Sequence, residues 1–116
     1  MELWKNYEVL IILNDEYNDD DLKNWSITSA KKLKRYNAHN ISVVSRGRHR
    51  FPYDIEQNRK GSYIQMNFNC MTKYADAFTA SIKESPPVIR CMTFRILDPN
   101  KRRKGGEIDD PLKLKE

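Results

Sequence analysis

The sequence predicts an α+β fold of the split β-α-β type, with a four-stranded antiparallel sheet and two helices on one face. Strand-like and helix-like segments follow one another in the order strand, helix, strand, strand, helix, strand. The first strand segment is almost wholly apolar, which is typical of a central strand covered on both faces. Pro52 has no amide hydrogen to donate, so the second strand is expected at a sheet edge. Together these observations describe the ferredoxin-like (βαββαβ) arrangement, whose first and third strands are central.

The first strand and the first helix are predicted in the N-terminal third of the chain. The strand is Tyr7–Leu13, YEVLIIL. A triple aspartate, 19–21, is expected to cap the helix and to place negative charge at its N-terminus. Asn37 is expected to end it. The lysines on its outer faces are expected to face solvent, with direct RNA contact as the alternative. The apolar stripe recurs at three- and four-residue steps: Leu22, Trp25, Ser29, Leu33 and Tyr36.

A β-hairpin over 46–68 is the central feature of the sequence. Its second arm, Ser62–Cys70, alternates apolar and polar residues, as a half-buried strand does. Gly47 in the first arm suggests a bulge or a close backbone approach. The polar stretch Glu56–Gly61 is expected to form a flexible tip.

The second helix and the last strand complete the predicted domain, residues 1–97. Thr72 is expected to cap the helix, and Ser85-Pro86-Pro87 to end it. Val88–Leu97 is the last strand, whose phase the sequence leaves ambiguous. Residues 98–116 have no periodic apolar face and are expected to be a flexible basic tail. The buried helix stripe is Ala75, Phe78 and Ile82.

Composition favours an acidic partner and argues against several classes of protein. The chain has 116 residues, enough for one domain, and a net charge of +5. No apolar run approaches the ~20 residues that cross a bilayer, so no membrane partner is expected. The two cysteines form no C-x-x-C motif and are expected to be buried hydrophobes, so no metal is expected. The histidines have no carboxylate partner in sequence, so we expect no enzyme, no cofactor and no small-molecule substrate.

The hairpin is the strongest candidate binding surface. Arg46, Arg48 and Arg50 alternate, so on a regular strand they would share one face and could contact phosphates. Protection of a sheet edge by charge is the alternative. Aromatic residues lie among these cations, so a stacking platform on Tyr63 for single-stranded RNA is a further option.

An apolar patch on the sheet face opposite the helices would indicate a protein partner. Leu10 and Ile12 are expected to be displayed there. The last strand would add Met92 and Phe94, or their neighbours, depending on its phase. The alternative is that the tail covers this face.

Four pieces of the chain, in order, resemble ribosomal protein six of the bacterial-type small subunit. The resemblance spans about Asn6 to Leu97. Within the family, the chain is most similar to the cyanobacterial and plastid branch. Phe51 replaces the family's usual leucine. The pieces are Asn6-Tyr7-Glu8-Val9 with the following strand, Arg46-Gly47-Arg48-His49-Arg50 leading into Phe51-Pro52-Tyr53-Asp54-Ile55, Gly61-Ser62-Tyr63, and Val88-Ile89-Arg90.

The resemblance implies a ferredoxin-like, non-enzymatic constituent of the small ribosomal subunit that binds small-subunit rRNA together with ribosomal protein eighteen. It implies a plastid (chloroplast) stroma location, with a bacterial cytoplasm as the alternative. The alternative function is a free-standing RNA-binding or regulatory module of the same fold, and a small phosphate-handling enzyme is a third hypothesis. The RNA-binding candidates are Arg46, Arg48, His49, Arg50, Arg59, Lys60, Lys101, Arg102, Arg103 and Lys104. The outer-face candidates for the protein partner are Leu10, Ile12, Tyr63, Met92 and Phe94.

Overall fold

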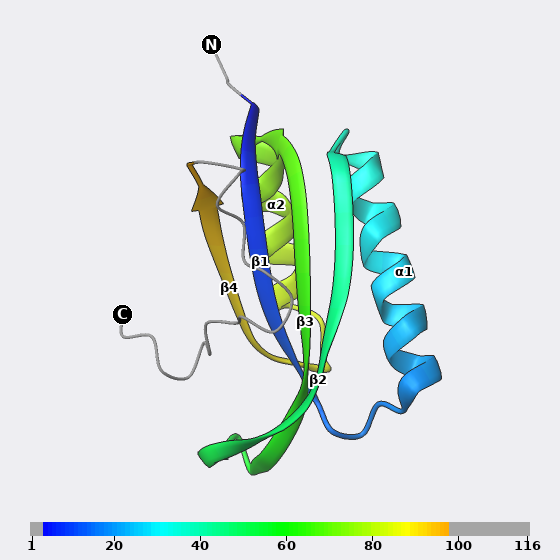
Figure 1. The fold of residues 1–116 in the computed structure, drawn as a ribbon, viewed down its shortest axis with the longest axis vertical. Coiled ribbons are helices and arrows are strands. Elements are labelled where there is room, and N and C mark those ends of the chain that lie inside the picture. Colours follow the sequence, from blue (N-terminus) through cyan, green and yellow to red (C-terminus); the bar gives the residue numbers. More distant parts are fainter. Residues whose placement is uncertain (1–3, 98–116) are drawn as a thin grey trace.

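The computed structural model describes residues 4–97, and the basic run at 101–104 lies outside them. The described chain forms a four-stranded sheet in the order β2-β3-β1-β4, in which all neighbouring strands are antiparallel (Figure 1). This confirms the predicted ferredoxin-like fold. The elements are β1 Trp4–Asn14, α1 Asp19–Arg35, β2 His39–Ile55, β3 Asn58–Met71, α2 Thr72–Lys83 and β4 Val88–Ile96.

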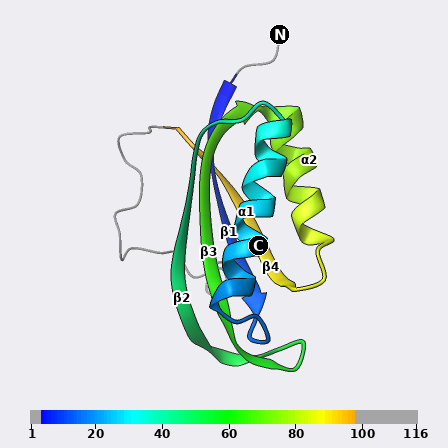
Figure 2. The same cartoon turned by 90° about the vertical axis from the view of Figure 1, so that its right-hand side faces the viewer.

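Both helices cover the same face of the sheet (Figure 2), and the main core lies between the two layers. Alternate residues of β1 and β3 supply its sheet side, because side chains of a strand point to opposite faces in turn. The helices supply the other side through the predicted stripes, although Trp25 and Tyr36 are only partly buried. The buried core includes Val9, Ile11, Leu13, Leu22, Leu33, Ile64, Met66, Phe68, Ala75, Phe78 and Ile82.

The ends of α1 are fixed by asparagines. Asn18 caps the N-terminus, where its Oδ1 accepts a hydrogen bond from the Asp21 amide at 2.8 Å. The Asp21 carboxylate accepts in return from the Asn18 amide at 3.2 Å, which completes a capping box. The capping residue is thus one position before the predicted aspartates. Asn37 follows the helix with a φ of 60°, a left-handed conformation that asparagine tolerates, and it ends α1 as predicted.

Thr72 does not cap α2, contrary to the prediction. The N-cap residue is Met71, which makes no side-chain capping bond, and Thr72 is the first helical residue. Its hydroxyl instead accepts a hydrogen bond from the Tyr7 hydroxyl at 3.0 Å, which joins the start of α2 to β1. A long-range partner has replaced the local one.

The positions of the strands follow the sequence. β1 and β3 are central, and β2, with Pro52, is at an edge. The register also settles the phase of β4, because Met92 pairs with Leu10 and Phe94 with Glu8. Met92 and Phe94 therefore lie on the outer face, opposite the helices.

The tip of the β2–β3 hairpin is shorter than predicted. Ile55 pairs with Asn58, so only Glu56 and Gln57 form the turn. Their φ values of 48° and 69° are both positive, as in the type I′ turns that match the twist of a hairpin. Gly61 is a buried strand residue rather than part of a flexible tip, because it pairs with both Asn14 and His49.

Gly61→Ala is expected to lower the free energy of unfolding by about 1–3 kcal/mol, the range for an overfilled core. A Cβ there would lie 2.6 Å from the Leu13 carbonyl oxygen and 2.9 Å from side-chain atoms of Ile12 and Phe51. Gly47→Ala is the matched control: nothing lies within 4 Å, but its φ of 85° should cost about 1–2 kcal/mol. Urea unfolding measures both. A wild-type midpoint for Gly61→Ala would contradict the close approach.

Burial raises the pKa of both free thiols, Cys70 and Cys91, from 9.0 to about 11. Asp76 raises the pKa of Cys70 further, while Lys83 partly opposes the shift at Cys91. Each thiol therefore holds its proton more tightly in the folded chain than in the unfolded chain. The resulting stabilisation is complete below pH 9 and is lost as the pH rises to about 11.

A Cys70→Ala/Cys91→Ala variant is expected to lose less free energy of unfolding than the wild type over this pH interval. Urea unfolding at a series of pH values measures the difference between the two proteins. Other groups titrate equally in both, so they cancel in the comparison. Equal losses would show that the thiols are not shifted.

Candidate functional site

A β-bulge divides the arginines of the hairpin between two faces. Ser45 pairs with Ile64 and Gly47 with Tyr63, so Arg46 is an extra residue in β2. Gly47 takes the positive φ of the bulge, as its place in the sequence suggested. One inserted residue reverses the alternation of a strand. Arg46 therefore lies on the outer face and Arg48 and Arg50 on the helix side, so the prediction that all three share one face is wrong.

On the outer face, Arg46 belongs to a polar network inside the protein. Its Nε and Nη2 donate to the Gln65 Oε1 at 3.0 and 2.7 Å. The Gln65 Nε2 in turn donates to Glu8 at 3.1 Å and to Asn67 at 2.9 Å. Glu8, Gln65 and Asn67 are all buried. Since a buried polar group is costly without a partner, this arginine has a structural role.

His49 also lies on the outer side of the hairpin. Its Nε2 is 2.8 Å from the carbonyl oxygen of Arg46, across the bulge. Its ring meets the Tyr63 ring edge-on, with 4.9 Å between centroids. Tyr63 is only 4% exposed, so it does not offer a free face on which a base could stack.

On the helix side, two cations of the hairpin converge on Asp15 in the loop between β1 and α1. The Arg48 Nε lies 3.5 Å from one carboxylate oxygen of Asp15, and the Lys60 Nζ lies 3.5 Å from the other. The Arg48 Nη2 also donates to the Tyr17 carbonyl at 2.5 Å, and its Nε donates to the Ser62 hydroxyl at 3.4 Å. These contacts join both arms of the hairpin to the body of the domain.

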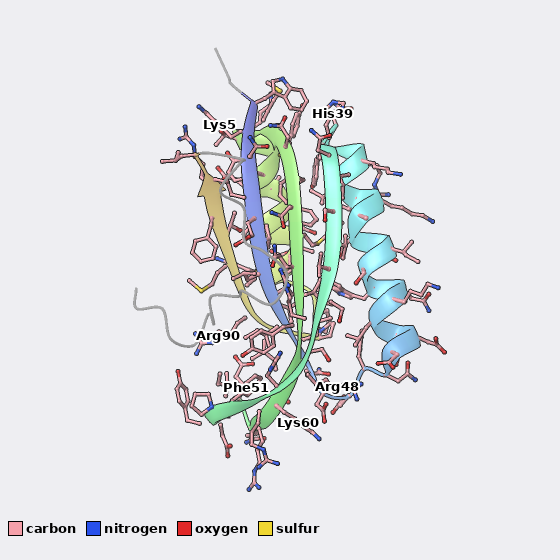
Figure 3. The ribbon with its side chains drawn as sticks, viewed as in Figure 1. Lys5, His39, Arg48, Phe51, Lys60 and Arg90 are labelled. Carbon is pink, nitrogen blue, oxygen red and sulfur yellow. The ribbon has the colours of Figure 1, made fainter. Side chains whose placement is uncertain are left out.

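The remaining cations of the hairpin are more open. Arg50 is exposed and lies directly opposite Lys60 in the register. Arg59 approaches Asp54 at 4.0 Å, with side chains that are 79% and 64% exposed. Such a surface pair adds little to stability. In Figure 3, Arg48 lies near the root of the hairpin on the side nearer α1, Lys60 lies farther along the hairpin, and Phe51 lies toward the opposite side.

The outer face does not display the expected apolar patch. Leu10, Ile12 and Tyr63 are on this face but are only 1%, 0% and 4% exposed. The hairpin is the reason at one end, because Phe51 and Ile55 fold onto Ile12 and Tyr63 in a second small core. Leu10 lies in register between Gln65 and Met92, on the same face. Of the five predicted partner residues, Met92 and Phe94 remain partly accessible.

Two residues of the site were missed in the sequence, Asp15 and Gln65. Each acts on an arginine far along the chain, and local spacing does not reveal such contacts. Within residues 4–97 no group of three or more His, Cys, Asp or Glu side chains could hold a metal ion. None of the helices in that part of the chain is long and apolar enough to span a membrane.

Arg46→Ala is expected to lower the free energy of unfolding by about 1–3 kcal/mol, because it leaves the buried oxygen of Gln65 without its donor. Arg50→Ala is the matched control, since its side chain is exposed, and is expected to stay within about 0.5 kcal/mol of the wild type. Urea unfolding distinguishes them. Equal stabilities of the two variants would argue against a structural role for Arg46.

Comparison with known proteins identifies the family. Residues 6–95 match the model of the family described as Ribosomal protein S6. Small ribosomal subunit protein bS6c of Phaeodactylum tricornutum is 43% identical over 94 residues, which cover 81% of this chain and 96% of that protein. The bS6c protein of Trieres chinensis is 42% identical over 90 residues, which cover 78% of this chain and 94% of that protein.

A solved structure supports the fold independently. The crystal structure of 30S ribosomal protein S6 from Thermotoga maritima superposes with a TM-score of 0.76, covering 85% of this chain and 94% of that one. At 23% identity this similarity concerns the fold alone. With the family match over 6–95 and the two bS6c relatives, it leads to one conclusion: the chain belongs to the ribosomal protein S6 family, and it resembles the plastid and cyanobacterial branch.

Proposed function

We propose that this chain is a structural constituent of a plastid small ribosomal subunit and binds small-subunit rRNA together with ribosomal protein eighteen. Family membership supports the ribosomal assignment, and the similar bS6c proteins are named as proteins of the small subunit. The family consists of structural ribosomal proteins, so the chain is not an enzyme. The plastid stroma is the proposed compartment, with a bacterial cytoplasm as the alternative.

The observation that carries RNA binding is the exposed cationic hairpin. Arg48, Arg50, Arg59 and Lys60 are all exposed on a two-stranded ribbon that extends past the rest of the sheet (Figure 1). Arginine and lysine neutralise phosphates and so supply most of the affinity of a protein for nucleic acid. Contacts of this kind position a protein on RNA without reading its sequence. Residues 98–116, with the cations at 101–104, are proposed as a basic tail that adds to this charge.

Ribosomal protein eighteen is proposed to meet the outer sheet face around Met92 and Phe94. Both side chains are half-buried and adjacent to the central strand β1. Half-exposed apolar side chains on a sheet face suit a protein contact. The outer-face candidates that are buried would pack against Met92, Phe94 and their surroundings rather than contact the partner. These residues are Leu10, Ile12 and Tyr63.

Sedimentation of source extracts through sucrose gradients tests the proposal. The chain, followed by immunoblotting, is expected to migrate with small ribosomal subunits at low and moderate salt and to leave them only at high salt, as phosphate contacts weaken. Fractionation should recover these subunits with plastids. Migration as a free small protein at every salt concentration would instead support the free-standing RNA-binding or regulatory module.

A further inference from the structure

We propose that Arg50 and Lys60 form a phosphate clamp for the RNA backbone on the helix side of the β2–β3 hairpin, with Arg48 and Asp15 as positioning residues. The inference rests on the proposed function, and it specifies which of the hairpin cations meet RNA. Among the three arginines of the first arm, it assigns Arg50 to the RNA and assigns Arg46 and Arg48 to contacts within the protein.

The register sets two positive charges against each other. Arg50 is directly opposite Lys60, and both side chains are exposed. Like charges in this position destabilise a sheet. Asp15 balances part of this charge through Lys60, but Arg48 shares the same carboxylate. One carboxylate is thus shared by two cations, and Arg50 adds a third positive charge beside Lys60. This excess positive charge is what a phosphate would neutralise.

The donors of the two clamp residues are largely unused in the described part of the chain. The Lys60 ammonium has three donors and approaches Asp15 alone at 3.5 Å. Arg50 has five donors, and no hydrogen bond or ion pair involves it among residues 4–97. A guanidinium can hold a phosphate through two parallel hydrogen bonds, while an ammonium adds a point charge beside it.

The other two arginines of the first arm, Arg46 and Arg48, are occupied by the protein. The Nε and Nη2 of Arg46 donate to Gln65 on the outer face, away from the clamp. Arg48 contacts Asp15, Ser62 and the Tyr17 carbonyl, and these contacts use its Nε and Nη2. Arg48 therefore fixes the hairpin root and Asp15, and Asp15 in turn orients the Lys60 ammonium.

The test measures the affinity of the full chain for small-subunit rRNA, with ribosomal protein eighteen present, over a series of potassium chloride concentrations. The slope of log affinity against log salt reports the number of phosphates neutralised, at about 0.7 to 0.9 for each. Arg50→Gln and Lys60→Gln are each expected to reduce the slope by about one contact, and the double variant by about two.

Three control variants show whether the positive charge at positions 50 and 60 causes the change in slope. Arg50→Lys and Lys60→Arg keep the charge and are expected to keep the wild-type slope. Lys31→Gln removes a similarly exposed cation from α1 and is expected to change nothing. Circular dichroism should show the same fold throughout, and relief of like-charge repulsion should leave the thermal midpoint of the glutamine variants equal or slightly higher.

The outcomes distinguish a failure of the phosphate clamp from a failure of the proposed function. Wild-type protein that fails to bind the rRNA at any salt concentration would overturn the proposed function, and the clamp with it. Binding whose slope is unchanged in Arg50→Gln and Lys60→Gln would overturn the clamp alone. An equal loss in Lys31→Gln would also overturn it, because the effect would then reflect net charge rather than a site.

Discussion

The uninterrupted pairing of β1 with β3 is the constraint on which the other features depend. Eleven residues of β1, Trp4–Asn14, pair without a shift with Met71 through Gly61 of β3. Every main-core side chain from the sheet is placed by this register, since one slipped residue would exchange the two faces. The close approach at Gly61 belongs to the same pairing, because only a residue without a Cβ lets β3 pass the Leu13 carbonyl.

The edge strand β2 pairs less regularly than the central strands, and this irregularity creates the site. β3 pairs with β1 without a shift, whereas the register of β2 on β3 shifts at three places, and the shift between Ser45 and Gly47 inserts Arg46 as one extra residue. From Ser42 to Ser45, β2 follows the inside–outside pattern of the sheet. After the bulge, Arg48 contacts the loop that follows β1, where Asp15 lies, and Arg50 shares the same side of the strand. A single insertion thus converts a row of like cations into two groups with different neighbours.

The sequence predicted the features that depend on local periodicity or on backbone chemistry. The apolar run 7–13 identified a central strand, Pro52 an edge strand, and Gly47 a bulge, because each signal acts through its own backbone. The prediction that Arg46, Arg48 and Arg50 share one face was wrong, because it assumed a regular strand and the bulge at Gly47 reverses the alternation. Thr72 was predicted as a cap because its long-range partner, Tyr7, is invisible to a local pattern.

The buried outer face shows a second kind of limit. Period-two alternation correctly placed Leu10 and Ile12 opposite the helices, but it could not show what covers them. The cover over Ile12 comes from the hairpin, whose strong twist brings Phe51 and Ile55 back onto the sheet. Twist accumulates over the whole length of two strands, so it cannot be predicted from a short stretch of sequence.

The hairpin is also fixed in place before any RNA arrives, and this affects how well it could bind. A two-stranded ribbon alone is only marginally stable in water. Here the ribbon is fixed on one side by Phe51 and Ile55 and on the other by the contacts of Arg48 with the β1–α1 loop. The clamp residues therefore have little backbone freedom left to lose on binding, and such preorganisation raises affinity by reducing the ordering cost. The repulsion between Arg50 and Lys60 acts in the same direction, because a bound phosphate would relieve it and the free protein cannot.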